Sequence, residues 1–246
     1  MLARAFFSKA GTGLRRENAT RQETRTPFRF QRNGIGSRRT ILAIGAAALL
    51  CGSLAPIANA KPEVGKPAPD FTGTDSKGKS VKLSDLRGKT VVLEWTNDGC
   101  PYVRKHYGSG NMQKLQADAA KDGVVWLSVI SSAKGDQGHV SPAEADKLTS
   151  SRNAAPAHVV IDDKSKIARA YQARTTPHMF VVDPEGKLVF MGGIDDKPSS
   201  NTADIPTAKN YVRLALDAVK AGRPVETPVA RAYGCSIKYA PEDTRS

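Results

Sequence analysis

An apolar run that ends in a cysteine–proline pair organises this chain: Thr90-Val-Val-Leu-Glu-Trp-Thr-Asn-Asp-Gly-Cys100-Pro101. Residues 91–95 are nearly all apolar, which predicts a strand buried at the centre of a sheet. Pro101 suits the first position of a helix, where its missing N–H would have had no partner. Cys100 therefore stands at a helix N-terminus, where free backbone N–H groups and the positive end of the helix dipole favour a thiolate. Because the thiolate is the nucleophile, we predict a reactive cysteine rather than a structural one.

Two charged neighbours are expected to act on Cys100 in opposite directions. Arg104 follows one helical turn later and would favour the anion, whereas Asp98 would disfavour it. Trp95 lies in the central strand, so we expect a core residue that also walls the site.

The remaining pattern alternates strands with helices. Helices are expected over 101–121, with a break at 108–110, over 166–173 and over 208–221, and one more at the capping box Ser141-Pro-Ala-Glu144. Strands are expected over 124–130, 158–161, 178–182 and 187–192. This order predicts the α/β class, with a sheet between layers of helices.

The positive charge is concentrated at the start of the chain. Residues 1–60 hold ten basic and two acidic side chains, which supply +8 of the formal net charge of +13. Residues 61–246 contain no basic block, so the charge does not predict nucleic-acid binding. We predict three parts: a leader with an export signal over 1–60, a domain over 61–221 and a Pro-rich tail over 222–246 that carries Cys235.

The leader has the features of an export signal. Ser37-Arg-Arg-Thr-Ile-Leu42 precedes an apolar stretch that ends at Leu50, and Ala58-Asn-Ala60 is a small-x-small cleavage site. The stretch is shorter than the ~20 apolar residues that span a bilayer, so no membrane span is expected once the signal is removed. The paired arginines favour the twin-arginine route, and a general secretory signal is the alternative. We therefore expect a periplasmic or otherwise exported protein. The Arg-rich first residues also leave a mitochondrial presequence open.

Cys100 and Cys235 are the two cysteines beyond the leader. An even pair in an exported chain is consistent with one disulfide, either structural or catalytic. Cys235 lies thirteen residues beyond Gly222, and an extended segment of that length reaches at most about 43–47 Å. Cys235 can therefore return to Cys100, or it can be a free thiol or bond to another molecule.

Three segments carry a family resemblance: Val64-Gly-Lys-Pro-Ala-Pro-Asp-Phe71, Leu86-Arg-Gly-Lys89 and Arg174-Thr-Thr-Pro-His-Met-Phe-Val-Val-Asp-Pro-Glu-Gly186. Over roughly residues 62–221 the chain resembles the redoxin family, also called the alkyl hydroperoxide reductase and thiol-specific antioxidant group, within the thioredoxin superfamily. The resemblance implies a thioredoxin-like fold with an N-terminal extension and a central mixed sheet flanked by helices. It also implies that Thr176-Pro177 is the cis-proline step facing the active-site cysteine. His178, the next residue, could then tune Cys100.

The tail Gly234-Cys-Ser-Ile-Lys-Tyr239, together with the segment from Glu94 to Tyr107, is similar to an exported bacterial subgroup of that family. The chain departs from its relatives at specific positions. Thioredoxins carry a second cysteine where Val103 stands, so a vicinal dithiol is not available. Peroxiredoxins carry Thr and Pro where this chain has Asn97 and Leu93.

Three functions remain open from the sequence. The first is an exported thiol–disulfide oxidoreductase in which Cys100 attacks a partner's disulfide or sulfenic acid, Cys235 resolves the mixed disulfide, and a thioredoxin-like donor reduces the pair. The second is a thiol peroxidase in which the sulfenic acid of Cys100 condenses with Cys235. The third is a non-enzymatic copper-handling module that uses Cys100 with His178 or His106. No cofactor is expected for the first two.

We predict that the exported protein begins at Lys61, because Ala58-Asn-Ala60 follows the apolar stretch at the spacing of a cleavage site. N-terminal sequencing of the protein recovered from the periplasm checks this. A mature protein that starts before Ser37, or one that is acylated at Cys51, would contradict the expectation.

Overall fold

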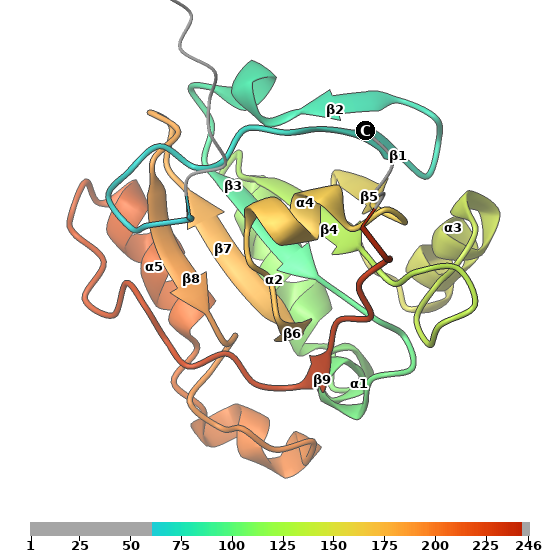
Figure 1. Cartoon of the computed structure of the whole chain (residues 1–246). Coiled ribbons are helices and arrows are strands. Elements are labelled where there is room, and N and C mark those ends of the chain that lie inside the picture. The colour runs from blue at the N-terminus through green and yellow to red at the C-terminus, as the bar shows by residue number, and fades with distance from the viewer. Residues whose placement is uncertain (1–60, 243–246) are drawn as a thin grey trace, which may run out of the picture. The chain divides into compact units, whose positions relative to one another are not determined.

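The computed structural model describes residues 61–242, which fold around a seven-stranded sheet (Figure 1). The predicted export signal and its predicted cleavage site lie outside the described residues. The strand order across the sheet is β2-β1-β5-β4-β3-β7-β8. The central strands β3, β4 and β5 are parallel, and the pairs at either side are antiparallel, so the sheet is mixed. The strands are β1 Thr72–Asp75, β2 Ser80–Lys82, β3 Val91–Trp95, β4 Val125–Ile130, β5 His158–Ile161, β7 His178–Val182 and β8 Leu188–Gly192.

Helices cover both faces of this sheet (Figure 1). One face packs against α1, α2 and α5, and the other packs against α4 and a short 3₁₀ helix, Leu83–Leu86, while α3 lies beside β5. The helices are α1 Pro101–Gly108, α2 Asn111–Lys121, α3 Pro142–Ser151, α4 Lys166–Ala170 and α5 Tyr211–Lys220, and a second 3₁₀ helix spans Thr202–Thr207.

The alternation of side chains along β3 divides the core into two halves. Leu93 and Trp95 belong to the cluster on the α4 face, whereas Val92 belongs to the cluster on the face of α1, α2 and α5. This is the period of two that a strand imposes. Cys100 belongs to the same half as Val92, so the helices of that face form its surroundings.

The predicted elements are present with small differences at their ends. The predicted helix over 101–121 is broken where expected, because Gly110 adopts a φ of 75° between α1 and α2. The capping box at Ser141 is formed. The last helix is shorter than predicted and begins at Tyr211, because the side chain of Asn210 caps it by accepting a hydrogen bond from the N–H of Arg213.

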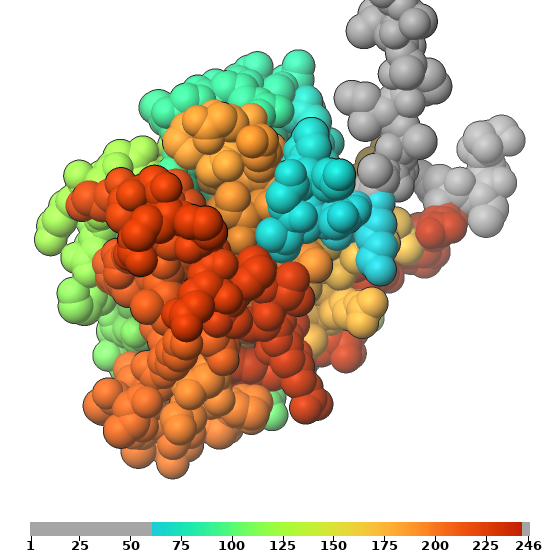
Figure 2. Space-filling view, turned by 90° about the vertical axis from the view of Figure 1, so that its left-hand side faces the viewer, coloured from blue at the N-terminus to red at the C-terminus, as the bar shows by residue number. Residues whose placement is uncertain are grey.

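The tail after α5 returns across the domain, passes α1 at its residues 235–236 and then continues to α4, where Glu242 forms an ion pair with Arg169 (Figure 1). It first lies along β8 (Figure 2). There the backbone N–H of Met191 donates to the carbonyl oxygen of Pro228, and the carbonyl oxygen of Met191 accepts from the N–H of Ala230. Gly192 permits this approach, since a Cβ there would lie 2.3 Å from the carbonyl oxygen of Ala230. The tail then forms β9, Cys235–Ser236, which pairs with the two-residue strand β6, Thr175–Thr176. The tail is thus packed against the domain on both sides of Cys235.

Within residues 61–242, no helix is both long enough and apolar enough to cross a membrane.

Candidate active site

Cys100 is the N-cap residue of α1, directly before Pro101 at the first helical position. It follows β3 by a short turn, and its side chain is fully buried. The side chain of Asn97 accepts a hydrogen bond from the N–H of Gly99 at 2.8 Å and so shapes this turn. The thiol of Cys100 donates to the carbonyl oxygen of Thr176 at 3.0 Å. The Thr176–Pro177 peptide is cis, so the structure brings together Cys100, Pro101, Thr176 and Pro177 as predicted.

Cys235 completes this arrangement from the tail. In the ladder between β6 and β9, Cys235 is the direct partner of Thr176, the same residue that accepts from Cys100. Cys235 packs against the core cluster that contains Cys100, its thiol lowers the pKa of the Cys100 thiol, and neither cysteine is in a disulfide. The structure therefore describes a reduced pair in direct contact.

Local contacts make Cys100 the more acidic thiol of the pair. Burial raises its pKa, but groups that can donate to a thiolate outweigh burial, so the pKa is lowered: the thiol of Cys235, the side chain of Thr176 and the backbone N–H groups of Val103 and Cys235. The N–H of Val103 belongs to the first turn of α1, where the helix leaves donors unpaired. The buried hydroxyl of Thr176 lacks an acceptor within the described residues, so it is available to donate to a thiolate.

Cys235 has the opposite tendency. Burial raises the pKa of its thiol, and the hydrogen bond and negative charge of Cys100 raise it further, while Lys238 lowers it. When the pair loses a proton, the negative charge is therefore carried by Cys100. Because the thiolate is the nucleophilic form of a cysteine, these contacts suit Cys100 better than Cys235 to act as a nucleophile.

Arg104 and Asp98, the two predicted charged neighbours, are both held by other partners. The Arg104 guanidinium donates to the backbone carbonyl of Asp98 at 2.8 Å, and the Asp98 carboxylate forms an ion pair with Arg152. Arg104 therefore braces the turn that leads to Cys100, and Arg152 neutralises the carboxylate. Sequence reasoning missed Arg152, since it lies at the end of a different helix and has no local motif.

Trp95 and His178 lie on the other face of the sheet. They are cross-strand partners, so their side chains share a face. Both contact the ring of Phe180, Trp95 edge-on and His178 at a tilt, in the cluster opposite to that of Cys100. The Nε1–H of Trp95 donates to Ser131. The Nδ1 of His178 accepts from the N–H of Arg174, and burial lowers its pKa to about 4. The structure thus places both away from Cys100, because strand alternation turns them to that face.

Two buried polar clusters on the Cys100 face had no signal in the sequence. Glu94 is fully buried, burial raises its pKa, and four side chains donate to it: Tyr107, Gln116, Trp126 and Ser128. The second cluster joins α1 to the tail and includes His106, which is fully buried. Both clusters depend on contacts between segments far apart in the chain.

No group of three or more His, Cys, Asp or Glu side chains in the described part of the chain is arranged to hold a metal ion. His178 lines a groove of about 460 Å³ on the opposite face of the sheet, together with Tyr171 and Arg174. The copper-handling alternative paired Cys100 with His178 or His106, and the structure places the His178 ring on the face of the sheet opposite to Cys100.

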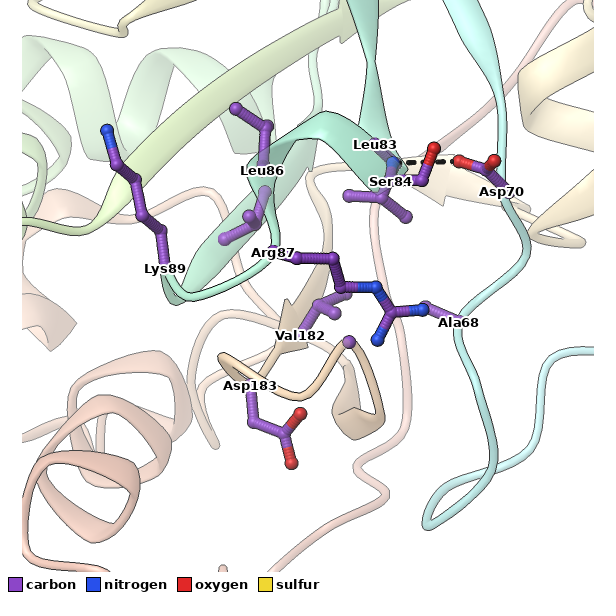
Figure 3. A pocket seen from close by; sticks show the side chains of 11 residues that line it. Ala68, Asp70, Leu83, Ser84, Leu86, Arg87, Lys89, Val182 and Asp183 are labelled. Carbon is purple, nitrogen blue, oxygen red and sulfur yellow. Dashed lines mark hydrogen bonds between the residues drawn. The ribbon is translucent and has the colours of Figure 1, made fainter.

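A small pocket lies at the far end of β3 from Cys100 (Figure 3). Val91, at the first position of β3, is one of its lining residues, and the side chain of Arg87 extends across it (Figure 3). Asp70 closes one side by accepting a hydrogen bond from the N–H of Ser84 at 2.9 Å. Its volume of about 20 Å³ is close to that of one water molecule, so it is a packing defect rather than a ligand site.

A family model described as AhpC/TSA matches residues 64–191. This chain belongs to the AhpC/TSA family. The match confirms the resemblance to redoxins, because it covers the entry segment, the strand before Cys100 and the step at Pro177.

Two curated relatives and one solved structure are similar to this chain. The thiol-disulfide oxidoreductase ResA of Bacillus subtilis is 29% identical over 132 residues, which span 51% of this chain and 64% of that protein. ResA of a Bacillus cereus strain is 30% identical over 129 residues, 52% of this chain and 69% of that protein. The crystal structure of an uncharacterized conserved protein from Geobacillus kaustophilus superposes with a TM-score of 0.64 at 28% identity, covering 73% of this chain and 94% of that one. The thioredoxin-like α/β fold is thereby confirmed.

This member of the AhpC/TSA family has no second cysteine on α1. Val103 occupies the position and is buried in the core below Cys100. The second thiol near Cys100 comes from the tail instead, through the pairing of Cys235 with Thr176.

We predict that Cys100 ionises below the ordinary thiol pKa of 9.0 and that Cys235 ionises above it. The Cys100 thiolate should therefore form first as the pH rises. Iodoacetamide labelling of the reduced protein from pH 5 to 11, followed by mass spectrometry of each peptide, gives both midpoints. Burial slows the labelling of Cys100 at every pH, but it leaves the midpoint as a measure of the pKa.

The matched control is Arg104→Ala, which should leave the Cys100 midpoint in place, since Arg104 contacts the Asp98 carbonyl. A midpoint for Cys100 at or above that of Cys235 would show that Cys100 is a structural residue.

Proposed function

We propose that this protein is an exported thiol–disulfide oxidoreductase in which Cys100 is the nucleophile and Cys235 is the resolving cysteine. The observation that carries the proposal is the contact between the two thiols at the N-terminus of α1. The name of the ResA relatives, thiol-disulfide oxidoreductase, supports the reaction class.

The reaction follows ordinary thiol–disulfide exchange. The Cys100 thiolate attacks one sulfur of a partner disulfide, which forms a mixed disulfide and expels the partner's other sulfur as a thiolate. Cys235 loses its proton and attacks the Sγ of Cys100, which releases the partner's first sulfur as a thiolate. The partner has then gained two electrons, the Cys100–Cys235 pair is an intramolecular disulfide, and the partner's thiolates take up protons. A thioredoxin-like dithiol donor would return two electrons to the pair.

The electrostatics of the pair supply an order for these steps. Cys235 is a poor nucleophile while Cys100 is ionised, because the Cys100 charge raises the pKa of the Cys235 thiol. That charge disappears when the Cys100 sulfur enters a mixed disulfide, and Lys238 remains as a neighbour that lowers the pKa. Cys235 thus becomes more reactive only after the partner is bound covalently.

The buried position of Cys100 implies that the tail moves during the reaction. Cys100 has no exposed surface, and Cys235 from the tail packs against it. A protein disulfide can therefore reach the Cys100 sulfur only when β9 leaves β6, and resolution requires that β9 return.

Peroxidase chemistry has less support from the same geometry. Asn97 stands where peroxiredoxins carry the threonine that positions peroxide, and its side-chain amide is already engaged with Gly99 and with the carbonyl of Gln137. These contacts shape the turn before Cys100 and leave the amide without a role toward a peroxide.

Export to the periplasm is part of the proposal and rests on the leader. The paired arginines at 38 and 39, the apolar stretch and the small-x-small site at 58–60 are its support. An oxidising compartment also suits a pair of thiols that works through a disulfide.

Replacing Cys235 with serine should stop the reaction at the mixed disulfide. With Cys51→Ser as the background, the reduced protein should release two equivalents of thionitrobenzoate from 5,5′-dithiobis(2-nitrobenzoic acid), because the second thiol displaces the first adduct. Cys235→Ser should release one equivalent and keep one bound to Cys100, and Cys100→Ser should release its one equivalent from Cys235. Mass spectrometry locates the adduct.

If the protein with both cysteines retained two bound adducts, Cys235 would not be resolving Cys100, and the proposed mechanism would be wrong.

A further inference from the structure

A buried polar cluster joins the tail to α1 just before Cys235. Its members are Lys105 and His106 on α1, Asp195 in the loop after β8, and Tyr233 in the tail. Each is at most 8% exposed. Burying charged groups in a protein costs free energy unless they are paired and hydrogen-bonded. The ion pairs and hydrogen bonds that offset this cost therefore show which segments the cluster holds together.

Asp195 is the centre of this cluster. Its Oδ1 accepts hydrogen bonds from the hydroxyl of Tyr233 and, at 2.9 Å, from the backbone N–H of Lys197. Its Oδ2 lies 3.6 Å from the Nζ of Lys105, which balances the charge, and accepts no hydrogen bond from any described residue. Lys105 is held in turn by the carbonyl oxygen of Lys197 at 2.9 Å.

His106 completes the cluster as a neutral ring. Its Nδ1 lies 2.9 Å from the side-chain amide of Asn111, which donates to it, so its proton is on Nε2. That nitrogen lies 3.4 Å from the hydroxyl of Tyr233 and 3.8 Å from Asp195. Because burial lowers the pKa of His106 to about 4, the ring does not supply a positive charge opposite Asp195 at neutral pH.

The chain between this cluster and Cys235 has little freedom. Gly234 alone separates Tyr233 from Cys235. Its φ is 131°, and a Cβ at this position would lie 2.0 Å from the carbonyl oxygen of Thr176. The position of Tyr233 therefore sets where Cys235 lies relative to Thr176 and Cys100.

The ladder between β6 and β9 needs this support. It contains two residue pairs, Thr175 with Ser236 and Thr176 with Cys235, and short two-stranded pairings are marginally stable on their own. Ile237 is buried on the far side of Cys235, so the tail is anchored by apolar packing after the cysteine and by the polar cluster before it.

We propose that Asp195 is a positioning residue for Cys235: by binding the Tyr233 hydroxyl in the buried cluster with Lys105, it holds β9 against β6 and the Cys235 thiol against Cys100. This rests on the proposed resolving role of Cys235. A buried ion pair stabilises little more than apolar residues would, but it accepts only one arrangement of its partners, and that suits a segment that must leave and return to the same register.

The proposal predicts opposite changes in two properties of the same pair. A loosened tail lowers the effective concentration of Cys235 at Cys100, so the intramolecular disulfide becomes harder to form. The same loosening uncovers Cys100, so its reaction with an external reagent becomes faster.

The test uses the full-length protein with Cys51→Ser and the variants Tyr233→Phe and Asp195→Asn. Equilibrium in glutathione buffers, read by mass spectrometry, gives the reduction potential of the Cys100–Cys235 pair. Since the lost hydrogen bond is to a charged group, we expect an about tenfold smaller equilibrium constant for the disulfide, which corresponds to about +30 mV for a two-electron couple. Labelling of reduced Cys100 by iodoacetamide should become about tenfold faster, because the opening of β9 from β6 that disfavours the disulfide also exposes Cys100.

Tyr211→Phe is the matched control, because no described residue hydrogen-bonds to its hydroxyl and it lies on α5; both readouts should stay within about twofold of the parent. Circular dichroism and urea unfolding verify the fold. Tyr233→Phe removes a single oxygen atom, so it carries the test if Asp195→Asn fails to fold.

Suppose that the parent protein forms the disulfide, and that Tyr233→Phe has the same reduction potential for the pair and the same labelling rate for Cys100 as the parent. That result would overturn the positioning role alone. A parent protein that forms no Cys100–Cys235 disulfide in any glutathione buffer would overturn the proposed resolving role, and the positioning role with it.

Discussion

The antiparallel pairing of Thr176 with Cys235 is the constraint on which the rest of the site depends. The carbonyl oxygen of Thr176 accepts from the thiol of Cys100, and the backbone of the same residue aligns the strand that carries Cys235. One residue therefore fixes both cysteines. Gly234 makes the approach possible, because any side chain there would overlap the Thr176 carbonyl. In this member of the AhpC/TSA family the second thiol is thus delivered by a strand from the tail rather than by α1.

Opposing effects on the two thiols divide their roles. Burial raises the pKa of both, and the N-terminus of α1 together with the neighbouring thiol reverses that effect for Cys100 only. A negative charge on Cys100 keeps Cys235 protonated, so the pair holds its resolving thiol in reserve until a partner removes that charge. The cost of this arrangement is access, since the strand that supplies Cys235 also covers Cys100. The tail is anchored by the contact of Tyr233 with Asp195 before Cys235 and by buried Ile237 after it, and only a two-residue ladder lies between these anchors. This arrangement suits a segment that must open and close.

Much of the fold was predictable, because its signals are local. The apolar run of β3, the break at Gly110 and the capping box at Ser141 each depend on residues close in sequence. Cys100 was predictable for the same reason, since a strand, a turn and Pro101 define a helix N-terminus. The face of the sheet on which Trp95 and His178 lie was not predictable, because a shift of one residue in a strand's register moves every side chain to the other face. The partner of Cys235, the ion pair of Asp98 with Arg152, and the cluster around Asp195 join distant segments, and only the folded chain brings those together.

The central claim is that the tail brings Cys235 to Cys100 as its redox partner. The most direct measurement is peptide mapping of the full-length protein after mild oxidation with diamide, digested without reductant and analysed by mass spectrometry. The account predicts one dominant disulfide-linked pair of peptides, containing Cys100 and Cys235 of the same molecule. Two free thiols at these positions after oxidation, or disulfides that join them only to Cys51 or to another molecule, would contradict it.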